Sequence, residues 1–366
     1  MIEKMKKDPI LWVSGLLAVI SCFIITPDLT YAEYVNWRVL AILGALMLVV
    51  GSLGNIGFFD YLTSKLLSSV KNQRMASIIL VVLSFILSMF MTNDVTLVTL
   101  VPFALVTIGS FGDKKSLMYT LILMTCAANL GSMMTPIGNP QNLYLYTNYK
   151  MTLSEFLILM APFTILSFVL IIAGCFILVK KGSGSSSAEI KPKPDALKTI
   201  ICIVLFVVAF LSVIDVLHYL IMLAVIVAAM LILDRKSFLK VDYSLLITFV
   251  FFFILIGNLG RMDVIHNTIS SVVDKAPVLT AVLSSQIISN VPAAMLLSAF
   301  TSDGKALVIG TNLGGLGTLI ASMASLITYK IYIRDNKDGG KYIAAFSVVN
   351  VIMLVILYVF GDLLFF

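Results

Sequence analysis

Charged residues are scarce in this chain. Only 12% of its 366 residues are Asp, Glu, Lys or Arg, 60% are hydrophobic, and the mean hydropathy is +1.06. A soluble domain carries about 25% charged residues. Apolar stretches of about 20 residues, the length that crosses a hydrocarbon core, recur from Trp12 to Phe366. The composition excludes an ordinary soluble protein and predicts an all-α polytopic membrane protein in a lipid bilayer.

Cysteine and histidine are also rare. The four cysteines, Cys22, Cys126, Cys175 and Cys202, lie in apolar runs without metal-ligand spacing, so we interpret them as packing residues. The sequence contains neither the His-Glu-x-x-His motif of a metalloprotease nor the paired membrane acids of an aspartyl protease. We therefore expect a protein that is not an enzyme and that needs no cofactor other than a coupling ion, Na⁺ or H⁺.

The apolar runs predict an ordered set of membrane segments. The first run lacks a small-x-small cleavage site, so we interpret it as a span and not as a signal peptide. Spans are expected at about 9–26, 36–56, 116–146, 154–180, 196–215, 217–234, 242–259, 304–327 and 343–365. The segments 75–110 and 276–302 are each interrupted midway by polar residues. We interpret them as re-entrant hairpins, with two full spans as the alternative.

The distribution of basic residues predicts the orientation. With the N-terminus inside, 20 of the 25 Lys and Arg residues fall in inside loops, which is the positive-inside pattern. The net charge of +6 therefore indicates a topology and not a nucleic-acid partner. We expect a bacterial or archaeal inner-membrane protein with a cytoplasmic N-terminus and an external C-terminus.

Short motifs recur along the chain in the same order. Gly51-Ser52-Leu53-Gly54 returns as Gly257-Asn258-Leu259-Gly260, Asn93 returns as Asn290, and Asn129-Leu130-Gly131 returns as Asn312-Leu313-Gly314. An odd number of spans separates the two copies, so they have opposite orientations. Inverted repeats with interrupted helices are typical of secondary transporters. The expected organisation is an N-terminal span (1–34), a first repeat (35–180), a cytoplasmic linker (181–195), two connecting spans (196–240) and a second repeat (241–366).

Two polar breaks interrupt the predicted hairpins. Thr92-Asn93-Asp94 lies in the first and Ser289-Asn290-Val291 in the second. Polar groups at this depth are costly unless they are satisfied or functional. Asn, Asp and Ser also cap helices, so each break is expected to start a second half-helix whose positive end points into a cavity.

A second kind of break is expected in the helices that follow the hairpins. Thr135-Pro136-Ile137-Gly138-Asn139-Pro140-Gln141-Asn142 cannot remain continuously helical, because its prolines and glycine free backbone groups. The freed carbonyls and the Asn and Thr side chains suit Na⁺. The counterpart is Gly314-Gly315-Leu316-Gly317-Thr318, continuing through Ser322 and Ser325.

Asp94 is the one acidic residue within the predicted breaks. A purely structural role as a helix cap is one interpretation. The functional hypothesis is coupling, because an ionised Asp94 would repel an anionic substrate until Na⁺ or a proton neutralised it.

These motifs resemble the ArsB/NhaD and citrate-transporter group of the ion transporter superfamily, to which divalent anion:sodium symporters are related. The resemblance rests on Thr92–Thr96, Thr135–Asn142 and Ser289–Pro292 and extends from about Asn36 to the C-terminus. It implies a dimerising scaffold domain, a mobile transport domain and an elevator mechanism. Neither hairpin tip is the Ser-Asn-Thr of the dicarboxylate branch, since Asp94 and Val291 replace the neutral hydroxyl residue.

We predict a secondary transporter that moves a small anion, a carboxylate or an inorganic oxyanion, with Na⁺ or H⁺ by alternating access. The alternatives are a Na⁺/H⁺ antiporter that exchanges ions at Asp94 and a passive channel. The expected substrate-binding residues are Thr92, Asn93, Thr135, Gly138, Asn139, Ser289, Asn290, Gly317 and Thr318. The expected coupling residues are Asn93, Asp94, Asn129, Asn142, Asn290, Asn312 and Ser322, with Na⁺ at Asn93, Asp94 and Asn290. A homodimer is also expected.

Overall fold

The computed structural model describes residues 8–68, 70, 72–182 and 190–365. The chain is all-helical, and no β-strand occurs in these ranges. Five helices of the described chain are long and apolar enough to cross a membrane. They are α4 (Trp37–Asn55), α10 (Leu153–Leu178), α11 (Ala196–Val213), α13 (Tyr243–Gly260) and α19 (Gly339–Phe365). The prediction of an all-α membrane protein is thereby confirmed at this level.

The remaining helices are shorter or less apolar. In the first half they are α2 (Pro9–Ile24), α3 (Tyr31–Tyr34), α5 (Phe58–Leu67), α6 (Gln73–Leu87), α7 (Asn93–Gly109), α8 (Lys114–Ser132) and α9 (Pro140–Asn148). In the second half they are α12 (Tyr219–Leu233), the 3₁₀ helix η1 (Arg235–Leu239), α14 (Asp263–Val273), α15 (Pro277–Ile288), α16 (Asn290–Ser298), α17 (Gly304–Leu313) and α18 (Met323–Asp335).

Two predicted spans form helices shorter than expected. The segments 9–26 and 217–234 become α2 and α12, of 16 and 15 residues. Helix α2 ends at Ile24, three residues before Pro27, and the proline disfavours helical conformation at Thr26. Helix α12 starts only after His218, whose Nδ1 accepts a hydrogen bond from the Leu220 amide at 3.3 Å. Both are shorter than the roughly 20 residues of a full perpendicular span.

The helix breaks predicted from the polar motifs are present. Residues 88–92 separate α6 from α7, and the single residue Ser289 separates α15 from α16. Residues 133–139 separate α8 from α9, and residues 314–322 separate α17 from α18. The predicted spans 116–146 and 304–327 are therefore each two helices. Residues 183–189 of the predicted linker at 181–195 lie outside the described residues.

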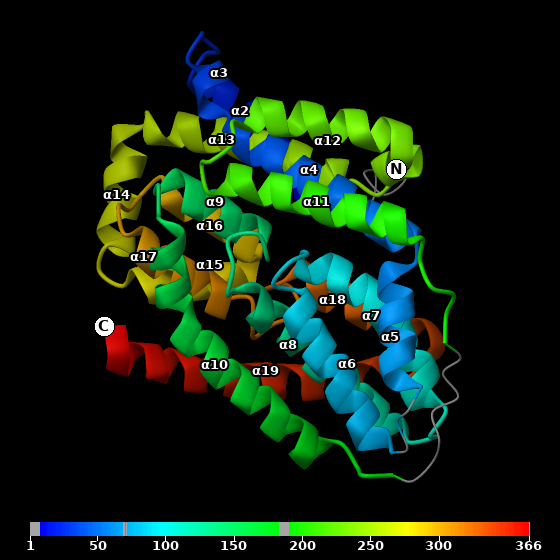
Figure 1. Cartoon of the computed structure of the whole chain (residues 1–366). Coiled ribbons are helices and arrows are strands. Elements are labelled where there is room, and N and C mark those ends of the chain that lie inside the picture. Colours follow the sequence, from blue (N-terminus) through cyan, green and yellow to red (C-terminus); the bar gives the residue numbers. More distant parts are fainter. Residues whose placement is uncertain (1–7, 69, 71, 183–189, 366) are drawn as a thin grey trace.

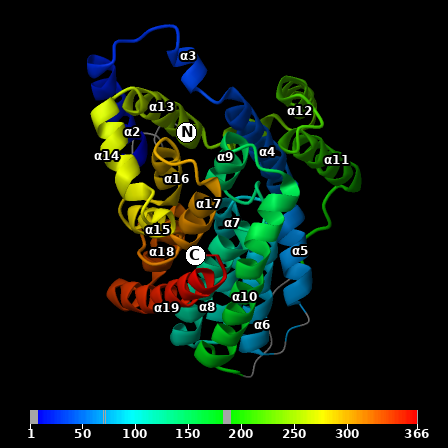
Figure 2. The same cartoon turned by 90° about the vertical axis from the view of Figure 1, so that its left-hand side faces the viewer.

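The helices form layers around a buried centre. Figure 1 shows α4, α11 and α12 along the upper edge, the interrupted helices in the middle, and α10 with α19 beneath them. Helix α8 packs against α6, α7, α10, α18 and α19. Its residues from Ser116 to Ser132 are all buried except Tyr119, which is partly buried. Figure 2 shows α11 and α12 on the side of the molecule opposite α14 and α15. The broken segments thus lie inside the protein, where irregular backbone can be satisfied.

Helices α2 and α13 form a closely packed pair that polar contacts connect along its length. The Ser244 hydroxyl donates to the Asp8 carboxylate at one end, and Asn258 Nδ2 donates to Ser21 Oγ at 2.9 Å. At the other end Arg261 donates to Asp28 at 2.9 Å. Hydrogen bonds from Thr30 and then Arg261 hold the pKa of Asp28 below its ordinary value. These contacts fix the α2–α13 register and place Asp8 beside the start of α13.

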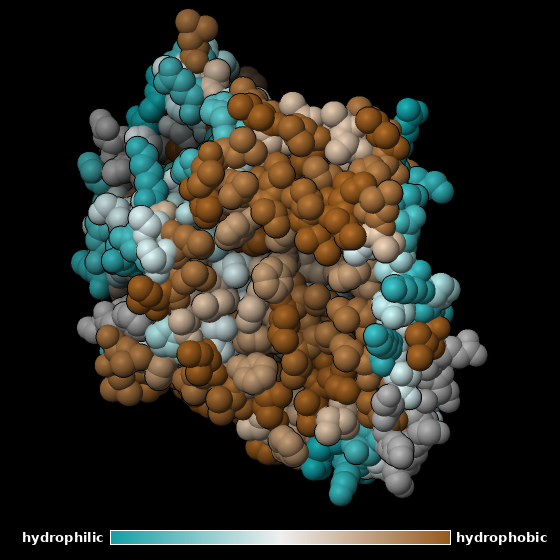
Figure 3. Space-filling model, in the orientation of Figure 1, coloured by the Kyte–Doolittle hydropathy of each residue, from teal (hydrophilic) through white to brown (hydrophobic). Residues whose placement is uncertain are grey.

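The surface has the pattern of a membrane protein. In Figure 3 hydrophobic residues cover the middle of one face, while hydrophilic residues gather along its left and right edges. The exposed apolar side chains include Ile165 and Ile177 of α10 and Ile232 of α12. A continuous apolar band of this extent would be an aggregation surface in water, and it is what lipid contact requires.

Gly131 of α8 provides a test of this packing. A Cβ atom at Gly131 would lie 2.1 Å from the Phe85 carbonyl oxygen of α6, whereas a Cβ at Gly54 of α4 meets nothing within 4 Å. We expect Gly131→Ala to destabilise the protein by about 1–3 kcal/mol or more, since overpacking forces the backbones apart. Gly54→Ala should be neutral or stabilising, because alanine favours helix. Thermal unfolding in detergent measures both, and equal melting temperatures would contradict the packing of α6 on α8.

Candidate functional site

A small cavity of about 60 Å³ lies where six helices begin. Its lining includes Asn93 and Asp94 of α7, and Asn139 and Gln141 at the start of α9. Ser289 and Asn290 of the α15–α16 junction, Ser322 before α18, Asp8 before α2, Asp242 before α13 and Thr248 within α13 complete its polar groups. Every one of these elements presents its N-terminus. The polar breaks that lie far apart in sequence therefore share one site.

Four of these helix N-termini lack a side-chain cap. The N-cap residues Thr92 of α7, Asn139 of α9, Ser289 of α16 and Ser322 of α18 accept no capping hydrogen bond with their side chains. The first amides of a helix have no partner within the helix and carry the positive end of its dipole. The carboxylates of Asp8 and Asp242, by contrast, cap α2 and α13. The cavity thus combines amide donors with carboxylate acceptors.

A network of buried amides connects the breaks of the two halves. Asn93 Nδ2 donates to Asn129 Oδ1 at 2.7 Å, and Ser322 Oγ donates to the same oxygen at 2.9 Å. Asn129 Nδ2 donates to the Gly315 carbonyl at 3.2 Å. The Asn290 amide donates to the Ala321 carbonyl at 3.0 Å. Because buried polar groups need partners, this network holds the α7 and α16 tips in fixed positions beside the cavity.

A second network lies behind the first break. Asn312 Nδ2 donates to Asn142 Oδ1 at 2.7 Å, and Asn142 Nδ2 donates to the Ser132 carbonyl at 3.2 Å. The Thr135 hydroxyl donates to the Met89 carbonyl and accepts from the Gly138 amide at 3.1 Å. None of Asn142, Asn312, Thr135 and Gly138 lines the cavity. Their contacts within the described structure order the break around the site.

Gly317 and Thr318 lie elsewhere. The Thr318 amide donates to Gln286 Oε1 at 2.9 Å, its hydroxyl donates to the Gln286 carbonyl, and its side chain is exposed. Gly317 has a φ of 103° and no room for a Cβ beside Gln286. Neither residue lines the cavity. The structure therefore brings Asn93, Asp94, Asn139, Ser289, Asn290 and Ser322 together at the cavity, places Thr92 and Asn129 directly beside them, and sets Gly317 and Thr318 apart.

Several cavity residues were not among the predicted site residues, and Asp8, Asp242 and Gln141 are the most informative of them. Asp8 and Asp242 resemble ordinary helix caps in sequence, and only the tertiary structure places them opposite the tips. Gln141 belongs to the Thr135–Asn142 motif, but no feature of the motif separates it from its neighbours. It is fully buried, and its Oε1 and Nε2 atoms have no hydrogen-bond partner in the structure. An unsatisfied buried amide at a cavity indicates a place for a ligand or an ordered water.

The comparisons with known proteins assign the family. The model of the citrate transporter family matches residues 1–303. The chain belongs to the citrate transporter family. It is 34% identical over 333 residues to an uncharacterized transporter of Methanocaldococcus jannaschii, covering 90% of each chain. It is 29% identical to the inner membrane protein YbiR of Escherichia coli, covering 85% of this chain and 84% of that one.

A shorter similarity reaches a plant transporter of the same group. The silicon efflux transporter LSI3 of Oryza sativa is 33% identical over 148 residues, which is 40% of this chain and 30% of that protein. The chain is accordingly a multi-pass membrane transporter and not an enzyme, as the motifs predicted. The resemblance to the ArsB/NhaD and citrate-transporter group is confirmed.

Ser289 has a strained backbone that can be measured. Its φ of 73° and ψ of 154° fall in a region that is nearly exclusive to glycine and costs about 1–3 kcal/mol. Both Ser289→Ala and Ser289→Gly remove the hydroxyl, but only glycine relieves the strain. We expect the glycine variant to be more stable than the alanine variant by roughly that amount.

Ser285 provides the matched control for this comparison. It lies within helix α15, where alanine should be the more stable of the two by about 1 kcal/mol. Chemical or thermal unfolding of the four variants should therefore give opposite orders at the two positions. The same order at both would show that Ser289 is not strained.

Proposed function

We propose that this chain is a secondary transporter that moves a small anion, a carboxylate or an inorganic oxyanion, together with Na⁺ or H⁺. The observation that carries the proposal is the convergence of four helix N-termini without side-chain caps on one cavity. Such N-termini bind anions through free amides and the helix dipole. Secondary transporters use half-helix N-termini in this way near the middle of the membrane.

The cavity supplies donors for an anion without a basic side chain. Its described lining contains no Lys or Arg. The hydroxyls of Ser289 and Ser322 already donate within the protein, to the Ala321 carbonyl and to Asn129 Oδ1. Asn139 and Asn290 present side-chain amide groups at its wall, and Gln141 offers an unpartnered Nε2. Neutral donors of this kind hold an anion without the desolvation cost of a buried cation. A site of this kind suits an anion that arrives together with its own counter-ion.

Carboxylates at the same cavity provide the coupling. Asp94 lies in the first turn of α7, and its own amide donates to Asn93 Oδ1 at 2.9 Å. An ionised carboxylate about 4 Å from an anion repels it by ~4 kcal/mol at an effective dielectric of 20. Binding of Na⁺ or a proton at Asp94 would remove that repulsion, so anion affinity would depend on the cation. Asn93 and Asn290 supply neutral oxygens suited to Na⁺.

The helix order supports an inverted repeat. A long helix, a short helix, an interrupted pair, a broken pair and a long helix follow one another as α4–α10, and the same order returns as α13–α19. Gly131 abuts the α6 backbone, and its repeat counterpart Gly314 abuts Ser285 of α15. The pairs α6–α7 and α15–α16 are then re-entrant hairpins whose tips meet at the cavity. Elevator motion would carry these hairpins past α2, α4, α11, α12 and α13.

The proposal includes an orientation in the membrane and a dimeric assembly. If the hydrophobic band of Figure 3 lies in the bilayer, the described N-terminal end and the chain end at α19 lie on opposite sides, as Figure 1 shows. The basic residues then place the N-terminus in the cytoplasm. An inner-membrane location is supported by the likeness to YbiR. A homodimer formed through the scaffold helices is proposed from the resemblance.

A Na⁺/H⁺ antiporter is the second candidate. It is favoured by the three carboxylates of Asp8, Asp94 and Asp242 around one cavity, since such groups exchange cations without any anion. Proteoliposomes separate the candidates. A symporter accumulates a labelled anion only under an inward Na⁺ or H⁺ gradient, whereas an antiporter moves protons against Na⁺ in a medium without a transportable anion. Saturable, gradient-driven flux would distinguish either from a channel.

The coupling role of Asp94 predicts the behaviour of Asp94→Asn. The neutral side chain mimics the protonated state, so we expect the dependence of anion affinity on the cation to fall about ten-fold or more, the effect of ~1.4 kcal/mol. If the cation is a proton, wild-type affinity should fall as pH rises through the carboxyl pKa, and the variant should show a flat profile. Asp60→Asn on α5, away from the cavity, should keep wild-type dependence. Unchanged coupling in the Asp94 variant would refute the role.

The unpartnered amide of Gln141 predicts an effect on binding without loss of stability. Gln141→Leu removes two unsatisfied buried polar atoms, so the melting temperature should hold or rise. The half-saturating substrate concentration should rise about ten-fold if the amide contacts substrate, since a lost hydrogen bond to a charged group is worth ~1.5–3 kcal/mol. Gln286→Leu is the control: its Nε2 donates to the Gly314 and Leu316 carbonyls, both at 2.9 Å, so stability should fall. Unchanged transport by Gln141→Leu would place the substrate elsewhere.

A further inference from the structure

A second, larger hollow lies on the opposite face of α13. It has a volume of about 500 Å³ and runs between α4, α12 and α13. Leu245 and Thr248 of α13 line the small cavity of the candidate site. Leu246, Ile247 and Val250 of the same helix line this hollow. We name it the α4–α13 groove. The two sites share a helix but no lining residue.

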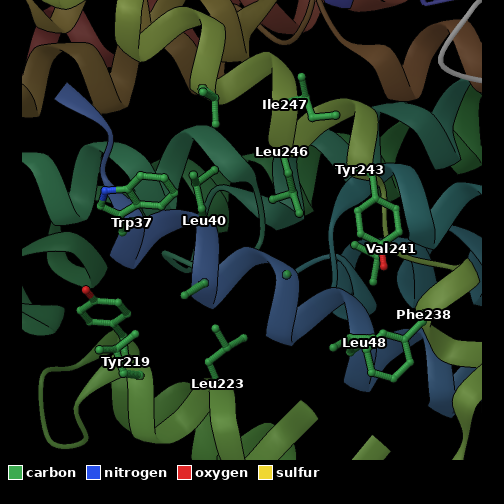
Figure 4. A pocket seen from close by; sticks show the side chains of 14 residues that line it. Trp37, Leu40, Leu48, Tyr219, Leu223, Phe238, Val241, Tyr243, Leu246 and Ile247 are labelled. Atoms are coloured by element: carbon green, nitrogen blue, oxygen red, sulfur yellow. The ribbon is translucent and has the colours of Figure 1, made fainter. Parts of the chain in front are cut away.

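The groove is apolar along its length and aromatic at its ends. Figure 4 shows Trp37 and Tyr219 at one end and Phe238 and Tyr243 at the other, with Leu40 and Leu223 between them. Tryptophan and tyrosine favour the level of the lipid headgroups, where their polar atoms reach water. The groove thus follows α4 from Trp37 to Leu48 between two aromatic ends. Because its sides are aliphatic, it suits a hydrocarbon chain and offers no partner to a polar ligand.

One end of the groove is basic. Arg235, Lys236 and Lys240 lie on or next to η1, the element that contributes Phe238, and all three are exposed. The acids beside them have other partners. Asp234 accepts from the Lys236 amide at 3.1 Å and from Asn55 Nδ2 at 2.8 Å, and Asp242 caps α13. At the other end Arg38 is paired with Asp215 at 2.6 Å. At the η1 end the three basic residues outnumber the acids Asp234 and Asp242, so the net charge there is positive, whereas Arg38 and Asp215 balance each other at the other end.

We propose that the α4–α13 groove binds one acyl chain of an anionic phospholipid whose headgroup phosphate lies against Arg235, Lys236 and Lys240. The ligand and the groove are complementary: the negative phosphate meets the basic end, and the acyl chain meets the apolar lining. Basic clusters at a membrane surface attract anionic lipids by about 1 kcal/mol per residue. A chain in the groove would also fill space between α4 and α13, which make few direct contacts, and protein interiors rarely tolerate such voids.

A second copy of this chain is the competing occupant. A dimer interface at the groove would involve no lipid phosphate and would bury roughly 1,200–2,000 Å² or more. The basic end distinguishes the two, because an apolar dimer interface gains nothing from three exposed cations at one end. The occupant is therefore decided by lipid content together with oligomeric state.

The test is the lipid retained by the full-length protein in detergent. Gly44→Phe should block the groove, because a Cβ at Gly44 meets only Leu246 Cδ1, at 3.8 Å, so the ring is free to enter. Val207→Phe on the exposed side of α11 is the matched control. Native mass spectrometry should find about one phospholipid on the wild type and the control, and at least five-fold less on Gly44→Phe. Arg235→Gln with Lys236→Gln and Lys240→Gln should abolish the preference for anionic over zwitterionic lipid.

A second measurement does not depend on the folding of the blocked variant. The chain has two tryptophans, Trp12 and Trp37, so Trp12→Phe leaves Trp37 at the groove as the only reporter. Phospholipid with a brominated acyl chain should quench Trp37 with saturation near one lipid per chain, and at several-fold lower concentration for a phosphatidylglycerol than for a phosphatidylcholine. Equal quenching by both, or lipid retention that Gly44→Phe leaves unchanged, would overturn the proposal. Loss of a dimer in Gly44→Phe with unchanged lipid would assign the groove to a second copy.

Discussion

Unsatisfied backbone groups in an apolar surrounding are the constraint on which this structure depends. A helix that stops inside a membrane protein leaves amides and carbonyls that lipid cannot satisfy. Four interruptions occur in the described helices, and their backbone polar groups are treated in two ways. Asn129 and Asn142 bind across the breaks, to the Gly315 carbonyl at 3.2 Å and to Asn312 at 2.7 Å. The uncapped helices instead begin at the cavity; the Asp94 and Asn290 amides have protein partners there, and no side-chain cap occupies the four N-termini.

The same constraint explains which parts of the site could be predicted from sequence. Pro140, Gly138 and the Asn residues of the breaks cannot continue an apolar helix at ordinary cost, so the interruption is visible in the sequence itself. The repeat then indicates that the breaks belong together. Asn93, Asn139, Ser289, Asn290 and Ser322 indeed share one cavity wall. The lengths of α2 and α12 were less predictable, because an apolar run can extend beyond the helix that it contains.

Other parts of the site depend on tertiary packing that no local pattern carries. Asp8 and Asp242 are N-caps in sequence and cavity residues only because α2 and α13 pair with their starts side by side. Thr318 occupies a position in the repeat like that of Thr135, yet it binds Gln286 and faces outward. The first break contains prolines and the second does not, so the two loops fold differently and the repeat is only approximate at this level. Gln141 is distinguished by side-chain atoms that lack a hydrogen-bond partner, which depends on the tertiary structure and not on the motif.

Helix α13 connects the properties of the two hollows. Its first residue follows Asp242 at the cavity of the candidate site, and Leu246 and Ile247 face the α4–α13 groove. A rigid helix cannot shift one face without the other. An acyl chain that separates α13 from α4 would therefore also set the distance between Asp242 and the α7 tip with Asp94. Because α2 is bound to α13 at both ends, Asp8 would move with it. The lipid on one face and the carboxylates on the other would then belong to one mechanical unit beside the N-termini of α7 and α16.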